Sequence, residues 1–188
     1  LQVADSLREA CSSVDPQQHL ILLPLAVLLD NLGAITALLN GASISVPTDT
    51  GLQGAQINPT RLLGVLNQSQ PHSLILVPQL LQGLLQAADA GIPLPRSLRF
   101  VAVGGGRVAP SLLERAAKHD LPVFEGYGLS ECASVVCLNR PGHNRPGTVG
   151  QPLPHVQIRV ADDGEIMVRG ARALGYLGEP PLTADEWP

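Results

Sequence analysis

The sequence is poor in aromatic side chains and in charge. Its 188 residues include 2 Phe, 2 Tyr and 1 Trp, and charged residues make up 15%. Lysine occurs once, at Lys118, and the formal net charge is −4, which disfavours a surface for nucleic acid or an anionic membrane. The three cysteines form no CxxC pair, so we expect neither a disulfide framework nor a zinc site. Such sparse cysteines favour a cytoplasmic location.

Long apolar runs are also missing. The longest, Leu20 to Leu29, contains Pro24 and is too short to cross a bilayer, so we expect no transmembrane segment. The first residues lack the basic and apolar regions of a signal peptide. Because the chain does not begin with Met, we expect it to be a fragment of a larger protein.

Aliphatic residues are abundant, with 32 leucines. Short apolar runs predict strands over 20–23, 43–46, 74–77, 98–103 and 122–125, and helical spacing predicts helices over 1–14, 25–40, 60–68, 79–90 and 110–119. We interpret 48–58 as a loop. Strands that are apolar on both sides need crossover helices, so residues 1–140 are predicted to form an α/β unit. It has a mostly parallel sheet with helices on both faces.

The pattern changes after about residue 145. Apolar and polar residues alternate over 156–160 and again from Ile166 to Val168, with Asp162-Asp163-Gly164 between them. This is the pattern of a hairpin with an Asp-Gly turn. We therefore assign 147–188 to a small antiparallel portion that follows the α/β unit.

Glycine-bearing segments follow the last two predicted strands of the α/β unit. Ligands of open α/β sheets bind beyond the carboxyl ends of strands, and neighbouring strands would bring these two segments together. The candidate nucleotide-binding residues in them are Gly104, Gly105, Gly106, Arg107, Glu125, Gly126, Tyr127, Gly128, Leu129 and Ser130.

The second segment holds the chemistry of a nucleotide site. The Tyr127 ring offers a face for a base, and the flanking glycines clear space for it. Ser130 can hydrogen-bond a phosphate, and Glu131 supplies an oxygen ligand for Mg²⁺, so both are candidate catalytic residues. A turn with a tyrosine that fills the core explains the same spacing equally well.

Residues 126–131, Gly-Tyr-Gly-Leu-Ser-Glu, resemble a motif of the AMP-forming adenylating enzymes, which include acyl-CoA synthetases, luciferases and peptide-synthetase adenylation domains. Further segments resemble motifs of this family in the same order. They are Leu23-Pro24-Leu25, Val77-Pro78, the strand 98–101 with the glycines 104–106, Pro146 to Pro154, Gly164 to Gly170, Gly175-Tyr176, and Thr183. The chain most resembles the central part of a long-chain-fatty-acid–CoA ligase.

The resemblance implies a fold, substrates and a reaction. The fold would be one subdomain of the large acyl-CoA synthetase-like domain, followed by the start of its β-barrel-like portion. Gly104 to Gly106 and Tyr127 would enclose adenine, Ser130 would contact phosphate, and Glu131 would hold Mg²⁺. A fatty acid would be activated by ATP as an acyl-adenylate and then transferred to coenzyme A.

Parts of the family's machinery are absent from these 188 residues. They contain neither the Ser/Thr/Gly-rich phosphate loop that ends in Lys-Gly nor the Thr-Gly-Asp motif. The family's catalytic lysine is also missing, because Lys118 lies among charged residues of a predicted helix. We therefore expect the chain alone to be inactive and, with apolar surface uncovered, to self-associate.

Two other functions fit parts of the sequence. Residues 104–109 match G-x-G-x-x-G/A, and Glu125 lies 19 residues beyond Gly106, which suits a dinucleotide-binding (NAD) oxidoreductase module. A non-catalytic scaffold domain would explain the missing motifs. The oxidoreductase alternative does not account for the Tyr127-to-Glu131 segment or for the motifs within 147–177.

Overall fold

A computed structural model describes residues 1–53 and 56–178 of the chain. The last part of the predicted 147–188 portion, including Thr183, lies outside the described residues. Among the described helices, none is long and apolar enough to cross a membrane.

A seven-stranded sheet with the order β2-β1-β5-β6-β7-β8-β9 forms the centre of the fold. The first five of these strands run parallel, and β8 and β9 join antiparallel. The predicted, mostly parallel sheet is therefore confirmed. The bounds are β1 (Gln18–Leu20), β2 (Ser43–Ser45), β5 (Ser73–Leu76), β6 (Phe100–Val103), β7 (Val123–Tyr127), β8 (Cys137–Leu138) and β9 (Gln151–Pro152).

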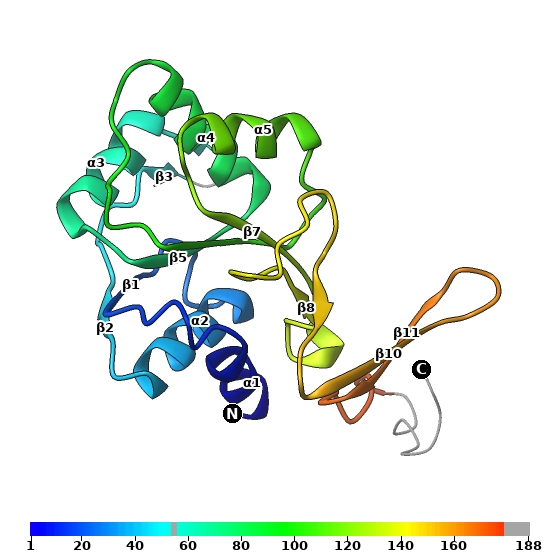
Figure 1. The fold of residues 1–188 in the computed structure, drawn as a ribbon. Coiled ribbons are helices and arrows are strands. Elements are labelled where there is room, and N and C mark those ends of the chain that lie inside the picture. The colour runs from blue at the N-terminus through cyan, green and yellow to red at the C-terminus, as the bar shows by residue number, and fades with distance from the viewer. Residues whose placement is uncertain (54–55, 179–188) are drawn as a thin grey trace.

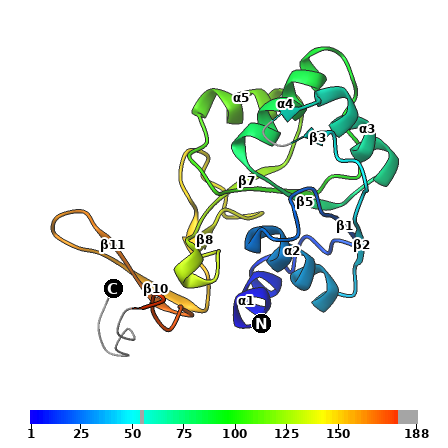
Figure 2. The ribbon, with the colours of Figure 1, turned by 180° about the vertical axis from the view of Figure 1, so that it is seen from behind.

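Helices cover both faces of this sheet (Figures 1 and 2). On one face, leucines of α3, α4 and α5 pack against Leu74 and Val101; on the other, α1 and α2 pack over the side that carries Phe100 and Phe124. The two phenylalanine rings stack with their centroids 4.7 Å apart. The bounds are α1 (Gln2–Ala10), α2 (Leu28–Leu39), α3 (Pro59–Ser69), α4 (Pro78–Asp89) and α5 (Pro110–Lys118).

Local sequence signals explain where three helices begin. Pro59, Pro78 and Pro110 occupy the first turn of α3, α4 and α5, where a residue without an N–H costs no helical hydrogen bond. Asn58 caps α3 by accepting a hydrogen bond of 3.0 Å from the Arg61 N–H. Lys118 is exposed in the last turn of α5, on the solvated face that was predicted for it.

Two short strand pairs lie outside the main sheet. Strands β10 (Val156–Val160) and β11 (Ile166–Gly170) form the predicted antiparallel hairpin, which projects away from the helices (Figure 1). Strands β3 (Leu52–Gln53) and β4 (Gln56–Ile57) pair within the segment that we predicted to be a loop. Because β9 pairs with β8, the main sheet continues past residue 147, the predicted start of the antiparallel portion.

Strand β1 begins and ends earlier in the chain than the strand predicted over 20–23. It ends at Leu20, and the backbone N–H groups of Leu22 and Leu23 donate to the carboxylate of Asp30. Helix α2 begins at Leu28, and Val27 before it is extended. The run 20–29 therefore holds a strand end and a connection closed by a buried carboxylate.

Candidate functional site

A cavity of about 420 Å³ lies between helices α1 and α2 and the sheet face that they cover. Its wall is mainly aliphatic and includes Leu7, Val14, Leu28 and Ile75. The residues that follow β6 and β7 form one end of it, at the carboxyl edge of the parallel strands. This is the edge where open α/β sheets bind ligands.

Strand register brings the two glycine segments together at this end. Val103 of β6 pairs with Glu125 of β7, so Gly104 and Gly126 follow in adjacent positions. A Cβ on Gly104 would lie 3.6 Å from the Gly126 carbonyl oxygen, and Gly105 has a φ of +76° that favours glycine. The predicted juxtaposition of the two segments is confirmed.

The candidate nucleotide-binding residues divide into two sets. Seven of them line the cavity: Gly104, Gly105, Gly126, Tyr127, Gly128, Leu129 and Ser130. The exposed Gly106 and Arg107 do not line it, and neither do Glu125 and Glu131. Tyr127 is half-buried at the cavity, and Ser130 is exposed.

The segment after Tyr127 turns back tightly on itself. Ser130–Cys132 form a single 3-10 turn, and Ala133 and Ser134 both adopt positive φ angles, of 54° and 84°. The Val136 N–H donates to the Tyr127 carbonyl over 2.8 Å, which closes the loop. A Cβ on Gly128 would overlap the Ser134 carbonyl, so glycine is required there.

Glu131 is held from the segment that follows the hairpin. The Tyr176 hydroxyl donates to Glu131 Oε1 over 3.1 Å, and the Ala173 N–H donates to the Glu131 carbonyl. The contacts come from a part of the chain more than forty residues away. They tie the loop after β7 to the segment after β11.

Glu125 is buried and bound within the fold. Its carboxylate accepts a hydrogen bond of 2.6 Å from the Gly147 N–H, and its backbone carbonyl accepts one from the Asn139 N–H. Burial raises the pKa of this carboxyl, although the Gly147 hydrogen bond acts in the opposite direction. Glu125 thus joins β7 to the 139–147 loop.

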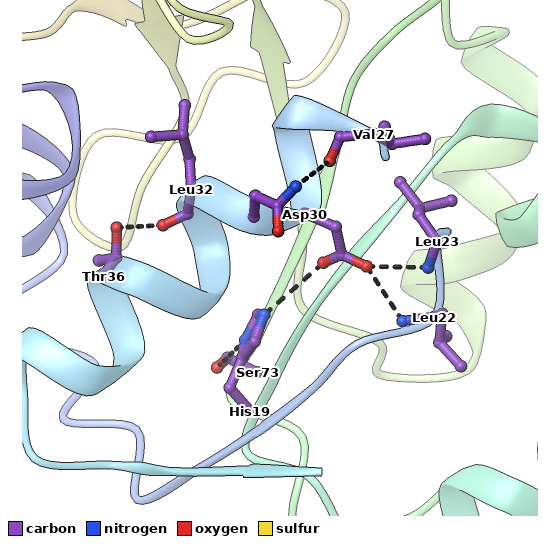
Figure 3. Close-up of polar contacts among 9 residues, drawn as sticks. His19, Leu22, Leu23, Val27, Asp30, Leu32, Thr36 and Ser73 are labelled. Carbon is purple, nitrogen blue, oxygen red and sulfur yellow. Dashed lines mark hydrogen bonds and ion pairs between the residues drawn. The ribbon is translucent and has the colours of Figure 1, made fainter. Parts of the chain in front are cut away.

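The sequence analysis missed a polar cluster on the inner wall of the cavity. His19 of β1 and Ser73 of β5 are register partners, and His19 Nδ1 lies 2.9 Å from Ser73 Oγ. The other ring nitrogen, Nε2, lies 3.7 Å from Asp30 Oδ1. Figure 3 shows His19 between the serine and the aspartate. The signal in the sequence was Asp30, the charge that ends a ten-residue apolar run.

All three members of this cluster are buried. Asp30 is 0% exposed, His19 3% and Ser73 6%. Asp30 Oδ2 accepts the Leu22 and Leu23 N–H groups at 3.0 and 2.8 Å, while Asp30 Oδ1 and His19 Nε2 have no hydrogen-bond partner. His19 and Ser73 line the cavity, so the cluster is part of its inner surface.

The cysteines and the possible metal ligands differ in where they lie relative to the cavity. Cys11 lines the cavity, and burial raises its pKa to about 11 against the lowering effect of Arg140. Cys132 and Cys137 pack in the core. Within 1–53 and 56–178, no three His, Cys, Asp or Glu side chains gather where they could hold a metal ion. One carboxylate beside bound phosphates suits Mg²⁺, which takes most of its ligands from water and phosphate, so Glu131 fits such an ion.

Comparison with known proteins gives one family and a set of related ligases. The family model for "AMP-binding enzyme" matches residues 2–177. A 2-succinylbenzoate–CoA ligase from Staphylococcus aureus (strain MSSA476) is 30% identical over 136 residues, which cover 68% of this chain. The same stretch is 27% of that ligase, so the chain spans about a quarter of the length of the curated relatives it matches.

Solved structures of CoA ligases share the fold. The anthranilate CoA ligase AuaEII in complex with anthranoyl-AMP matches with a TM-score of 0.81 and 20% identity, covering 95% of this chain and 36% of the ligase. The o-succinylbenzoate CoA synthetase of Bacillus subtilis in complex with ATP and a magnesium ion matches with a TM-score of 0.73 and 23% identity, covering 94% and 37%. The architecture in Figure 1 is therefore that of acyl-CoA synthetase-like domains.

Proposed function

The chain belongs to the family of AMP-binding enzymes, and from this membership we propose that it is part of an ATP-dependent, AMP-forming acid–CoA ligase. In the proposed reaction a carboxylate attacks the α-phosphate of ATP, giving an acyl-adenylate and pyrophosphate. The thiol of coenzyme A then displaces AMP and forms a thioester. The meeting of the Gly104–Gly105 and Gly126–Ser130 segments at one end of the cavity carries this proposal.

We propose that the nucleotide lies at this end of the cavity. The half-buried Tyr127 ring stacks on the adenine, and the glycines of both segments let the backbone approach it. The exposed Ser130 hydroxyl contacts a phosphate. Gly106, Arg107 and Glu125 complete the proposed nucleotide-binding set from outside the cavity lining.

Glu131 is the proposed Mg²⁺ ligand. Tyr176 occupies its Oε1, which orients the carboxylate and leaves Oε2 for the ion. Bound Mg²⁺ offsets charge on the phosphates during their displacement. The residues that this chain contributes bind and orient the nucleotide. A Bacillus synthetase of the same fold was solved with ATP and a magnesium ion, which supports the choice of this ligand pair.

The acid is proposed to occupy the interior of the cavity. Its aliphatic wall suits an apolar acyl group, which supports the fatty-acid substrate expected from the sequence. The relatives' names describe a different acyl class, since they are succinylbenzoate and anthranilate ligases. The proposal at this level is a carboxylic acid with a largely apolar body.

For the 188-residue chain alone we propose no turnover. The chain spans 27% of the curated ligases' length and lacks the phosphate-loop and Thr-Gly-Asp motifs. A pyrophosphate-release assay with ATP, Mg²⁺ and a panel of acids measures this directly. Sustained release of pyrophosphate by the purified chain would overturn the proposed inactivity.

A titration with ATP, AMP and NAD tests the nucleotide assignment. We expect Mg²⁺-ATP and AMP to bind more tightly than NAD in calorimetry, because the Glu125 carboxylate required by the dinucleotide alternative is bound to Gly147. Tyr127→Ala should weaken AMP binding by about 1–3 kcal/mol, whereas Tyr127→Phe keeps the stacking ring. Tighter binding of NAD, or equal AMP affinity in both variants, would contradict the assignment. No binding of any of the three would favour the scaffold alternative.

Self-association and location complete the proposal. Apolar side chains are exposed on and before α2, among them Leu25, Leu28, Leu38 and Leu39, and these support association of the isolated chain. A monomer at all concentrations in analytical ultracentrifugation would contradict it.

All three cysteines are unpaired, which supports the proposed cytoplasmic location.

A further inference from the structure

We propose that the buried cluster of His19, Asp30 and Ser73 recognises a hydroxyl group at the far end of the acid substrate. This inference rests on the proposed function, because it assigns the cavity to the acid. It goes further in naming the substrate class: a hydroxy acid, with its hydroxyl remote from the carboxyl group that reacts.

The position of the cluster sets it apart from the glycine segments. Ser73 is the register partner of Phe100, and Gly104 follows Phe100 by four residues. At the rise of a β-strand, Ser73 and Gly104 are therefore separated by about 13 Å along the sheet. Both residues line the same cavity. An acid with its carboxyl group at Gly104 thus extends its other end toward Ser73.

Asp30 has a structural role, because it accepts the Leu22 and Leu23 N–H groups, but that role requires neither His19 nor Ser73. Burying polar groups away from water costs free energy unless their hydrogen bonds are made, yet Asp30 Oδ1 and His19 Nε2 make none. The fold keeps room for the imidazole, since a Cβ on Gly33 would lie 3.0 Å from His19 Nε2 and 2.5 Å from Ile75 Cδ1. A leucine or valine at position 19 would fill the wall without this cost.

The hydrogen bonding of Ser73 selects the ligand group. Its hydroxyl has one donor and two acceptor positions, and the bond to His19 Nδ1 uses one of them. Whether Ser73 donates to that nitrogen or accepts from it, an acceptor position remains for a ligand. A ligand O–H therefore fits both arrangements, and it adds no charge beside Asp30.

His19 and Asp30 act through Ser73 as positioning residues. Asp30 is anchored by two backbone N–H groups, so its other oxygen, Oδ1, is fixed 3.7 Å from His19 Nε2. The imidazole in turn fixes the rotamer of the Ser73 hydroxyl over 2.9 Å (Figure 3). The recognition group is thus held by elements β1, β5 and α2 together.

Calorimetric titration of the chain, without nucleotide, tests the proposal. The ligands are straight-chain ω-hydroxy acids and the unsubstituted acids with equal numbers of carbons, over a series of lengths. We expect the hydroxy acid to bind about 2- to 10-fold more tightly at the best length, the value of one hydrogen bond. Ser73→Ala should remove this preference, so that the hydroxy acid and the unsubstituted acid bind the variant equally.

Thr36→Val is the matched control. Thr36 lines the same cavity, but its hydroxyl donates to the Leu32 carbonyl within α2 over 2.7 Å and is not held by His19, so this variant should keep the hydroxyl preference. Thermal melting of each variant verifies that it is folded. Equal affinity for the two acids in the wild type, a preference that survives Ser73→Ala, or a preference lost in Thr36→Val overturns the proposal.

A parallel titration with Mg²⁺-ATP separates the two proposals. ATP binding without a hydroxyl preference leaves the proposed ligase function intact and overturns hydroxyl recognition. A hydroxyl preference without ATP binding supports the recognition site and contradicts the ligase. Failure of every acid to bind overturns hydroxyl recognition, and tighter binding of ω-carboxy or ω-amino acids than of hydroxy acids does so too.

Discussion

The phenol of Tyr176 donates a hydrogen bond of 3.1 Å to Oε1 of Glu131. One partner follows the β10–β11 hairpin, and the other lies on the loop after β7, so this contact joins the antiparallel hairpin to the edge of the main sheet. The position of the proposed Mg²⁺ ligand therefore depends on a residue outside the α/β unit.

Replacing Tyr176 by phenylalanine should weaken binding of Mg²⁺-ATP. The variant keeps the ring and loses the donor that orients the Glu131 carboxylate, and loss of such an outer contact typically costs a metal site about 10-fold or more in affinity. Calorimetry with ATP in the presence and absence of Mg²⁺ measures the effect. An unchanged Mg²⁺ dependence would show that Tyr176 does not position the ligand.

Adding one methyl group at Gly128 should disrupt the loop. In Gly128→Ala the new Cβ would overlap the Ser134 carbonyl, so we expect a loss of about 1–3 kcal/mol in unfolding free energy, with impaired AMP binding. Gly64→Ala is the control, because this exposed glycine within α3 has open space around it. Alanine should stabilise that helix by about 0.5–1 kcal/mol. Urea denaturation that gives both variants the same stability would contradict the loop geometry.

Glu125 should make the protein less stable as pH rises. Burial raises the pKa of this carboxyl, so between its unfolded and folded pKa the folded state holds more protons than the unfolded state. Its contribution is therefore most favourable at low pH and is lost as pH rises through the raised value. Glu125→Gln retains an acceptor for Gly147 and should flatten this part of the stability profile. Equal pH slopes for the two proteins in urea unfolding would argue against the raised pKa.

Cys11 should alkylate slowly in the folded protein. Burial raises its pKa from 9.0 to about 11, which lowers the thiolate fraction near neutral pH by about 100-fold. Iodoacetamide labelling followed by peptide mass spectrometry, with and without urea, measures this difference. Because Cys11 lines the cavity, a bound acid should slow the reaction further. Fast labelling of native Cys11 would be inconsistent with its burial.

Truncating a buried leucine should lower the unfolding free energy far more than truncating an exposed one. Leu81 of α4 is fully buried, so Leu81→Ala should cost about 2–5 kcal/mol in unfolding free energy. The same change at Leu38, which is 60% exposed on α2, should stay within about 0.5 kcal/mol. Denaturant midpoints of the two variants provide the comparison, and similar shifts would contradict the packing.

The sequence indicated the order of strands and helices because their apolar periods differ. It failed at 20–29, where strand, connection and helix are equally aliphatic and no local period separates them. The boundary there is set by Asp30, which binds the Leu22 and Leu23 N–H groups from a distance of eight and seven residues, respectively. A contact of that kind leaves no periodic trace in the sequence.

The sequence revealed the glycine-segment part of the candidate site and did not reveal the polar cluster on the inner wall. The Gly126-to-Glu131 segment is continuous and carries its chemistry in adjacent letters. His19 and Ser73 are 54 residues apart and meet because β1 pairs with β5, although β2 follows β1 in the chain. The sequence predicted the strands themselves, but which strands pair with each other is determined by tertiary packing.

Different elements build the two ends of the cavity. The paired strands β6 and β7 fix the glycine segments through their backbone ladder, whereas helix α2 contributes the side chains of Leu28, Leu29, Thr36 and Ala37 to the wall. Backbone hydrogen bonds between strands persist when a side chain is replaced, whereas a wall made of side chains changes its shape. Substitutions along α2 therefore change the shape of the acid-binding part of the cavity while the backbone of the glycine segments stays in place. This helix is the first choice for altering which acids the cavity accepts.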